Sequence, residues 1–271
     1  MAQNEVVRID IDKVVAARAK GKKIPKFVIR WIKKFIHQDE LNEFLDKGYL
    51  GVDFAVKGLE YLNVKIDIIG EENIPAEGKF TFVCNHPLGG VDALNQIAFL
   101  GTKYNGNIVS PANDFLMNVK QVQEYLVPVN KLGAQGKSLS GLLDEAFQGD
   151  RQLFIFPAGL CSRKIDGVIT DTPWKKTFIT KSRESQRDII PMWFSGHNSK
   201  RFYRVDAFCK FFGIKFPLAM LCLPDEVFRC RNKSFQVRIG KPIPWETFTK
   251  DKKDIEWANE VRKVCYALGE E

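Results

Sequence analysis

Apolar and polar residues change their spacing along the chain near residue 63. Beyond this point, short apolar runs typical of buried strands alternate with stretches of helical periodicity. The predicted strands are residues 64–69, 80–84, 107–110, 125–129, 152–156, 188–194 and 235–239. The predicted helices between them are residues 92–101, 137–148, 173–183 and 201–212. This alternation predicts an α/β fold with a mixed, largely buried sheet flanked by helices.

The first 62 residues have the pattern of an amphipathic helical arm. Residues 24–36 place apolar side chains at helical spacing, with Trp31 and Phe35 in the apolar stripe and basic residues opposite. A second helix is predicted at residues 39–47. We therefore expect an arm, residues 1–62, that docks on the body or lies on a membrane surface, and a catalytic α/β domain, residues 63–271.

The net charge of +8 is concentrated in this arm. Nine lysines and arginines and no acidic residue lie between Asp12 and Asp39, so the remainder of the chain is close to neutral. A basic helix with aromatic residues suits a lipid interface. The alternative is a docked helix whose lysines are merely solvated. No nucleic-acid partner is expected, because no helix-turn-helix, zinc module or aromatic-interleaved sheet accompanies the arm.

Cysteine spacing and hydropathy narrow the class of protein. The six cysteines lack the paired spacing of a zinc site, which predicts reduced thiols and no metal. The N-terminus lacks the pattern of a signal peptide, and no segment reaches the ~20 apolar residues of a membrane span. We expect a peripheral protein that lies at the cytoplasmic face of a membrane without crossing it. The sequence does not indicate its oligomeric state.

The clearest candidate for chemistry is the segment NHPLGGVD, residues 85–92, which follows a predicted strand. The strand holds His86, and the glycines let the chain turn back, so that Asp92 can approach the imidazole. A carboxylate there fixes the tautomer of the ring and stabilises its protonated form, which predicts that His86 is a general base. The alternative is a core histidine with Asp92 as a helix cap. Cys84 offers a thiolate nucleophile as a further alternative, although a core position is expected for it.

The Asn85-His86 pair followed by Asp92 resembles the signature of the glycerolipid acyltransferase superfamily, the lysophosphatidate acyltransferase-like enzymes. Four residues usually separate the histidine and aspartate in those enzymes, whereas five separate them here. The longer spacing is similar to a bacterial subgroup labelled hemolysin-like, which includes O-acyltransferases that complete ornithine or glycine aminolipids. The resemblance implies that His86 and Asp92 are catalytic and that Asn85 and Gly89 take part in substrate binding.

Further blocks follow in the family's order and extend the resemblance over residues 63–244. Residues 156–164 are similar to the family's Phe-Pro-Glu-Gly-Thr-Arg-Ser block, which lines the acceptor head-group site. The implied binding residues are Phe156, Pro157, Gly159, Ser162, Arg163 and Lys164. A glycine turn followed by two cations offers donors and charge to an anionic group. The family's glutamate is Ala158 here, so any role of that carboxylate is missing or moved.

The next departure concerns the group that would bind a phosphate. Residues 125–131 occupy the place of a family block that ends in a phosphate-binding arginine, but Asn130 and Lys131 stand where the arginine would be. Lysine supplies charge without the bidentate fork of arginine. This departure and Ala158 favour an acceptor with a carboxylate head group. His197, after the strand at 188–194, is expected at the surface or at a pocket rim.

The resemblance implies an O-acyltransferase that moves a fatty acyl group from a thioester to the hydroxyl of a lyso-lipid. A lyso-aminolipid is the favoured acceptor, and 1-acylglycerol-3-phosphate is the alternative. No cofactor is expected beyond the donor, which is acyl carrier protein or acyl-CoA. The acidic carrier protein is preferred, because a basic surface attracts it. A lipid hydrolase and a non-catalytic membrane-associated protein are the alternatives of another class.

Overall fold

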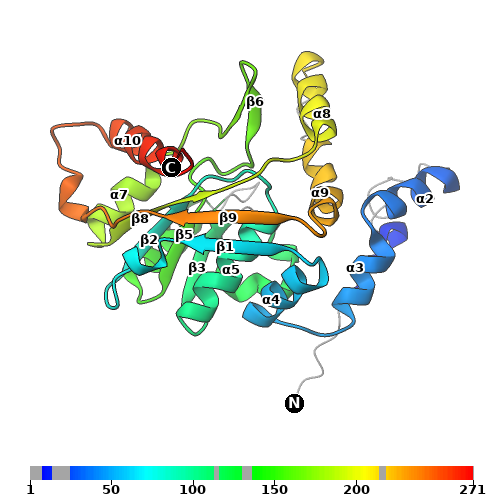
Figure 1. Cartoon of the computed structure of the whole chain (residues 1–271), viewed down its shortest axis with the longest axis horizontal. Coiled ribbons are helices and arrows are strands. Elements are labelled where there is room, and N and C mark those ends of the chain that lie inside the picture. The colour runs from blue at the N-terminus through cyan, green and yellow to red at the C-terminus, as the bar shows by residue number, and fades with distance from the viewer. Residues whose placement is uncertain (1–7, 14–24, 113–115, 130–135, 214–217, 271) are drawn as a thin grey trace.

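A seven-stranded sheet lies at the centre of the molecule, with strand order β1-β9-β8-β2-β5-β3-β4 (Figure 1). The computed structural model describes residues 8–13, 25–112, 116–129, 136–213 and 218–270. The strands of the sheet are β1 (Lys65–Ile69), β2 (Phe80–Cys84), β3 (Ile108–Ala112), β4 (Leu126–Pro128), β5 (Gln152–Ile155), β8 (Asp188–Phe194) and β9 (Ser234–Ile239). From β8 to β4 the strands run parallel, whereas β9 and β1 run in the opposite direction. The predicted mixed α/β fold is confirmed.

Helices cover both faces of the sheet. One face packs against α4 (Gly51–Tyr61) and α5 (Val91–Lys103), and the other against α6 (Gly136–Gln148), α7 (Thr177–Glu184) and α10 (Asp254–Ala267). The central strand β2 has every residue buried, because both of its faces are covered. Its even-numbered residues Phe80, Phe82 and Cys84 join the α4–α5 core, whereas Val83 joins the α7–α10 core.

Every predicted strand is present, with ends within two residues of the expected positions. The helix predicted at 173–183 is α7, but it begins four residues later, at Thr177. The delay has a physical cause, because backbone N–H groups of the preceding loop donate to distant parts of the chain. Asp171 donates to the hydroxyl of Tyr266, and Lys175 donates to the carbonyl of Pro157. The sequence interpretation did not include α4, α9 (Leu223–Arg229), α10 or the hairpin of β6 (Arg163–Ile165) and β7 (Val168–Thr170).

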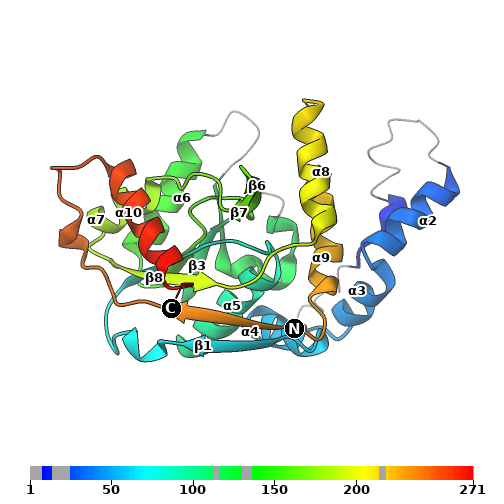
Figure 2. The same cartoon turned by 45° about the horizontal axis from the view of Figure 1, so that its top comes forward.

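Two pairs of helices stand beside one end of the sheet (Figures 1 and 2). They are α2 (Lys26–Phe35) with α3 (Gln38–Leu45), and α8 (Lys200–Phe211) with α9. The pairs are joined where His37 Nε2 lies 3.1 Å from Asp225 Oδ1 and the His37 ring stacks on Phe228. The two helices predicted in the arm are therefore present as α2 and α3.

The arm is only partly packed against the body. No residue of α2 is buried, whereas Phe44 of α3 and Phe54 of α4 belong to the same core as β2. The division at residue 62 stays a prediction, and residues 14–24 of the basic stretch lie outside the described residues. In the described part of the chain, no helix has the length and apolar character needed to cross a bilayer.

Arg187 is a buried cation that ties three backbone segments together. Its guanidinium has no exposed surface and donates to the carbonyls of Phe147 at 2.7 Å, Gly149 at 2.5 Å and Phe80 at 3.4 Å. Burial lowers its pKa to about 10. These carbonyls belong to the end of α6 and the start of β2, so Arg187 holds both elements next to β8.

Replacing Arg187 with methionine should lower the free energy of unfolding by about 3 kcal/mol, because buried carbonyls lose their donor. Urea denaturation would measure the loss. The matched control is Arg151→Met, which removes a half-buried guanidinium with one bond to the carbonyl of Glu124. It should cost about 1 kcal/mol or less. Equal losses in both variants would contradict the role given to Arg187.

Candidate active site

The candidate residues meet where neighbouring parallel strands end. Strands β8, β2 and β5 are adjacent and parallel, so their carboxyl ends lie at one edge of the sheet. Phe194 ends β8, Asn85 and His86 follow β2, and Phe156 follows β5. Ligand sites of α/β proteins lie at this edge of the sheet. The structure thus brings together the first two sequence blocks that predicted chemistry.

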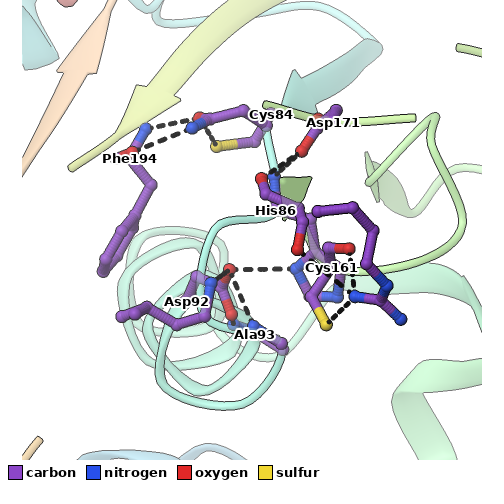
Figure 3. A network of polar contacts seen from close by, with 12 residues as sticks. Cys84, His86, Asp92, Ala93, Cys161, Asp171 and Phe194 are labelled. Carbon is purple, nitrogen blue, oxygen red and sulfur yellow. Dashed lines mark hydrogen bonds and ion pairs between the residues drawn. The ribbon is translucent and has the colours of Figure 1, made fainter. Parts of the chain in front are cut away.

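His86 and Asp92 form a hydrogen-bonded pair at this edge (Figure 3). The His86 Nδ1 lies 3.0 Å from Asp92 Oδ2. The carboxylate has no exposed surface, whereas the imidazole side chain is 14% exposed. A carboxylate bonded at Nδ1 favours the tautomer with its proton there, which leaves the lone pair on Nε2. In the described part of the chain, no group bonds to Nε2.

The turn between the two residues holds the carboxylate in place. Asp92 Oδ2 also accepts from the backbone N–H groups of Leu88 at 3.0 Å and Gly89 at 3.2 Å, and Oδ1 accepts from Ala93 at 3.0 Å. Burial acts to raise the pKa of Asp92, but the His86 ring and these backbone donors outweigh burial, and the pKa lies below its usual value. Asp92 is therefore an ionised acceptor beside the imidazole.

Glycine is required at both positions of the turn. Gly89 has a φ of +79°, where glycine is favoured, and a Cβ there would lie 3.1 Å from that of Cys161. A Cβ on Gly90 would lie 2.4 Å from Val227 Cγ2. The five-residue spacing of His86 and Asp92 is thus accommodated by a turn that packs directly against its neighbours.

Phe156 forms one wall of the site. Its ring stacks on the imidazole of His86, with centroids 3.9 Å apart and an interplanar angle of 20°. The stacked ring limits rotation of the imidazole, so Nδ1 stays directed at Asp92. The structure gives Phe156 a contact with the candidate base, while the substrate contact expected for it stays a prediction.

Asn85 clamps the histidine loop to β8. Its side-chain Nδ2 donates to the carbonyl of Phe194 at 2.9 Å, and its Oδ1 accepts from the Phe194 N–H at 2.6 Å. This reciprocal pair mimics a strand hydrogen bond one residue beyond the end of β2. Asn85 is only 4% exposed. Its role in substrate binding stays a prediction beside this structural role.

Asp171 organises the backbone of the site and was not identified from the sequence. Its Oδ1 accepts from the His86 N–H at 3.2 Å and from Ser162 Oγ at 2.6 Å, and its Oδ2 accepts from Trp174 Nε1 at 2.9 Å. The Ser162 N–H donates to the His86 carbonyl at 2.7 Å. Burial raises the pKa of Asp171 despite these hydrogen bonds. One carboxylate thus joins three loops at the site.

No sequence signal marks Asp171. It lies 85 residues from His86 along the chain, in a loop between the β6–β7 hairpin and α7, and a single aspartate in a loop is common. Pro87 and Ser162 line a cavity of about 270 Å³ next to this network, together with Asn85 and Tyr266.

The block at residues 156–164 lies beside the histidine, but its members have different environments. Pro157 and Ala158 are buried, and Gly159 is at an exposed turn with φ of +69°. The structure therefore places Ala158, where the family has glutamate, in the apolar core of Val83 and Trp174. A carboxylate at this buried position would lack solvent.

The two cations of this block differ in what they can bind. The Arg163 side chain is 5% exposed; its Nε lies 2.9 Å from Asp206 Oδ1, and its Nη1 donates to the carbonyl of Cys161 at 2.6 Å. Its charge is therefore balanced inside the protein. Lys164 is exposed and forms no ion pair with the residues that the structure describes. Asn130 and Lys131, the other predicted head-group residues, lie outside the described residues.

The structure also gives the positions of Cys84, the alternative nucleophile, and of His197. Cys84 is fully buried, and burial raises the pKa of its thiol well above the usual value, which disfavours a thiolate nucleophile. His197 is exposed, and its Nδ1 lies 2.8 Å from the carbonyl of Asn198. Among the described residues, no cluster of histidine, cysteine and carboxylate side chains could hold a metal ion.

Comparison with known proteins identifies the family. The sequence matches the model of a family described as acyltransferase over residues 13–271. The chain belongs to this acyltransferase family. The resemblance to the glycerolipid acyltransferase superfamily and its aminolipid subgroup is confirmed.

Two relatives of this acyltransferase carry the name lyso-glycine lipid O-acyltransferase. The relative from Bacteroides thetaiotaomicron is 47% identical, over 99% of this chain and 100% of its own length. The relative from Phocaeicola vulgatus is 46% identical, over 99% of this chain and 98% of its own. The solved structure of the 1-acyl-sn-glycerophosphate acyltransferase PlsC from Thermotoga maritima has the same fold, with a TM-score of 0.53 and 16% identity over 96% of this chain and 87% of that chain.

The role of Asp171 in this acyltransferase can be tested by Asp171→Asn. The amide keeps one acceptor oxygen but places an NH₂ where a second acceptor is needed, so the free energy of unfolding should fall by about 2 kcal/mol. Because the His86 backbone loses its anchor, kcat should fall about tenfold with little change in KM for the acceptor. Urea denaturation and steady-state kinetics would measure both effects.

The control for this variant is Asp188→Asn. Asp188 accepts a hydrogen bond from the Trp245 N–H at 3.0 Å, at the opposite end of β8 from the site. The Asp188→Asn variant should have a lower free energy of unfolding but an unchanged kcat. An unchanged kcat in Asp171→Asn would show that this aspartate is structural only.

Proposed function

We propose that the chain transfers a fatty acyl group from a thioester to the hydroxyl of a lyso-glycine lipid. The observation that carries the proposal is the His86 imidazole, bonded at Nδ1 to a buried, ionised Asp92 and partly exposed at the carboxyl edge of the sheet. The acceptor is proposed from the two full-length relatives that carry that name. Both matches cover 99% of this chain and therefore include the region of the site.

The proposed reaction is a direct transfer. His86 Nε2 removes the proton from the acceptor hydroxyl while the oxygen attacks the thioester carbonyl. When the tetrahedral intermediate collapses, the C–S bond breaks and the imidazolium returns the proton to the leaving thiolate. Asp92 stabilises the imidazolium between these events. The step needs no covalent acyl-enzyme, which agrees with the burial and raised pKa of Cys84.

Lys164 is the proposed partner of the acceptor's carboxylate. It is the exposed cation of the block at 156–164, whereas Asp206 already balances the charge of Arg163. Arg163 then acts indirectly, by holding the carbonyl of Cys161 and the loop beside His86. Acyl carrier protein remains the preferred donor, because the basic surface of the arm favours an acidic partner. A peripheral position on the cytoplasmic face of the inner membrane fits this acceptor and this charge.

The proposed site for the acyl chain is an apolar groove of about 490 Å³ between α4, β1 and α5. Val56, Ile66, Ile68 and Phe99 line it. Asn95 is the lining residue of α5 that follows Asp92 most closely, one helical turn later, and the others on α5 lie further along the same helix. A groove of this size is within the usual range for small-molecule sites.

An acyl-transfer assay can distinguish His86 as a base from Cys84 as a nucleophile. It uses purified full-length protein, lyso-glycine lipid and a fatty acyl thioester of either acyl carrier protein or CoA. His86→Ala should lower kcat about 10³-fold, the range expected for loss of a general base. Cys84→Ala should keep kcat within about threefold of the original protein. Mass spectrometry of the diacylated product would follow the reaction. Full activity in His86→Ala would remove the base from the mechanism.

Product and acceptor analysis separates the proposed function from its alternatives. Free fatty acid without diacylated lipid would indicate a hydrolase. Transfer to 1-acylglycerol-3-phosphate in preference to lyso-glycine lipid would assign the phosphate acceptor instead. Comparison of the two thioesters at equal concentration would identify the donor.

The acyl groove can be tested by Thr102→Phe, which adds a ring to a lining residue on α5 roughly 15 Å beyond Asp92 along the helix. Activity with a C16 donor should fall about tenfold, whereas activity with a C8 donor should change less than about threefold, since the shorter chain ends before the added ring. The C8 donor serves as the control within the same variant. An equal loss with both donors would place the chain elsewhere.

A further inference from the structure

The C-terminal end of α8 exposes three phenylalanines. Phe208, Phe211 and Phe212 are 53%, 83% and 60% exposed. Their rings contact one another, with centroids 4.5 Å apart for Phe208 and Phe212 and 5.0 Å apart for Phe211 and Phe212. Single exposed apolar residues are common, whereas a contiguous aromatic cluster marks an interaction surface. We call these three residues the α8 cluster.

Packing of α8 on the body does not require the α8 cluster. The buried side of the helix is formed by other residues, Phe202, Tyr203 and Cys209, which pack toward the hairpin and η4 (Leu218–Cys222). Asp206, on the same inward side, lies 2.9 Å from Arg163 Nε. The helix therefore has a complete inner face, and the cluster on its outer face is available to a partner.

The exposed charged residues of α8 are basic. Lys200, Arg204 and Lys210 are exposed on α8. The only acidic residue in the sequence of this helix is Asp206, which is 14% exposed and engaged by Arg163 and Lys210. Aromatic rings surrounded by cations suit the interface of an anionic membrane, where rings enter the head-group region and cations meet lipid phosphates.

Helix α2 presents a second surface of the same kind. Phe27 and Trp31 are 73% and 62% exposed, Lys26, Arg30 and Lys34 are exposed beside them, and the helix contains no acidic residue. In Figures 1 and 2, α8 extends upward from α9, and α2 extends to the upper right from α3. Both helices therefore carry exposed aromatic and basic residues on the outside of the molecule.

The two surfaces are tied to each other and to the active site. The guanidinium of Arg201 on α8 lies over the ring of Phe35 on α2, 4.7 Å from its centroid. The Asp206–Arg163 ion pair connects the middle of α8 to the loop that bonds to His86. Since α8 has 12 residues and is roughly 18 Å long, contact at its end would hold the site at a fixed distance from the membrane.

We propose that the α8 cluster enters the interface of an anionic lipid membrane, with Phe27 and Trp31 of α2 as the second contact. This inference rests on the proposed function, because a lyso-lipid acceptor is presented by a membrane. It adds a second lipid-binding element to the basic arm and sets the orientation of the enzyme on the bilayer. The partner is the lipid surface itself.

Sedimentation of the full-length chain with vesicles tests the proposal. Phe208→Ser, Phe211→Ser and Phe212→Ser combined should weaken partition into phosphatidylcholine–phosphatidylglycerol vesicles at least about tenfold. The matched control, Val168→Ser with Val264→Ser, removes exposed apolar residues from the hairpin and α10 and should change partition less than about twofold. Vesicles of phosphatidylcholine alone should bind the original protein more weakly.

Two further measurements keep the test independent of folding. Acyl transfer to acceptor dispersed in detergent should change less than about twofold in the triple variant, while transfer to acceptor in vesicles falls with partition. In the Phe211→Trp variant, phospholipids with brominated acyl chains should quench more tryptophan fluorescence than they quench in the original protein. Absence of added quenching would count against insertion.

Other outcomes would overturn the proposal. Unchanged vesicle binding in the triple variant would overturn it. If the variant then had a raised KM for acyl carrier protein, the α8 cluster would be a binding surface for that protein. If the variant lost a dimer that the original protein forms, the cluster would bind a second copy of the chain. If the original protein bound vesicles through the cluster but transferred no acyl group, the proposed function would fail while this inference stood.

Discussion

The hydrogen bond between His86 and Asp92 depends on keeping a charged carboxylate out of water. Burial alone would favour the neutral acid, so the site is built to supply donors to Asp92: the imidazole and three backbone N–H groups. These donors come from the turn and the start of α5, which is why Gly89 and Gly90 must let the chain pass close to its neighbours. The His86–Asp92 pair and the turn are one structural unit.

The strands on either side then fix the unit in the molecule. Asn85 ties it to Phe194 at the end of β8, Phe156 after β5 stacks on the imidazole, and Asp171 bonds to the His86 backbone. Each contact uses a different neighbour, so the imidazole is held from several directions. Such positioning matters for a general base, because proton transfer needs a short, well-aligned approach between the base and the hydroxyl.

The sequence predicted what is local and missed what is assembled over distance. The strand before His86, its glycine turn and Asp92 lie within 13 consecutive residues, and the pattern alone predicted their approach. Asp171 is close to His86 only because a hairpin and a loop return to the sheet, and nothing local marks it. Helix α10 was missed for a different reason, because its buried residues, Ala258, Val261 and Cys265, are few and do not form a strongly apolar stripe.

Arg163 shows that a residue in a sequence motif need not have the chemical role that the motif suggests. A basic residue after a glycine turn suggests binding of an anion, but the structure gives it Asp206 on α8 and the carbonyl of Cys161. Removing Asp206 would leave the buried guanidinium of Arg163 without a counter-charge, which is costly. The same ion pair joins the active-site loop to the helix that carries the exposed α8 cluster. A residue expected to bind the acceptor directly thus connects the His86 loop to the helix whose exposed end is proposed to meet the membrane.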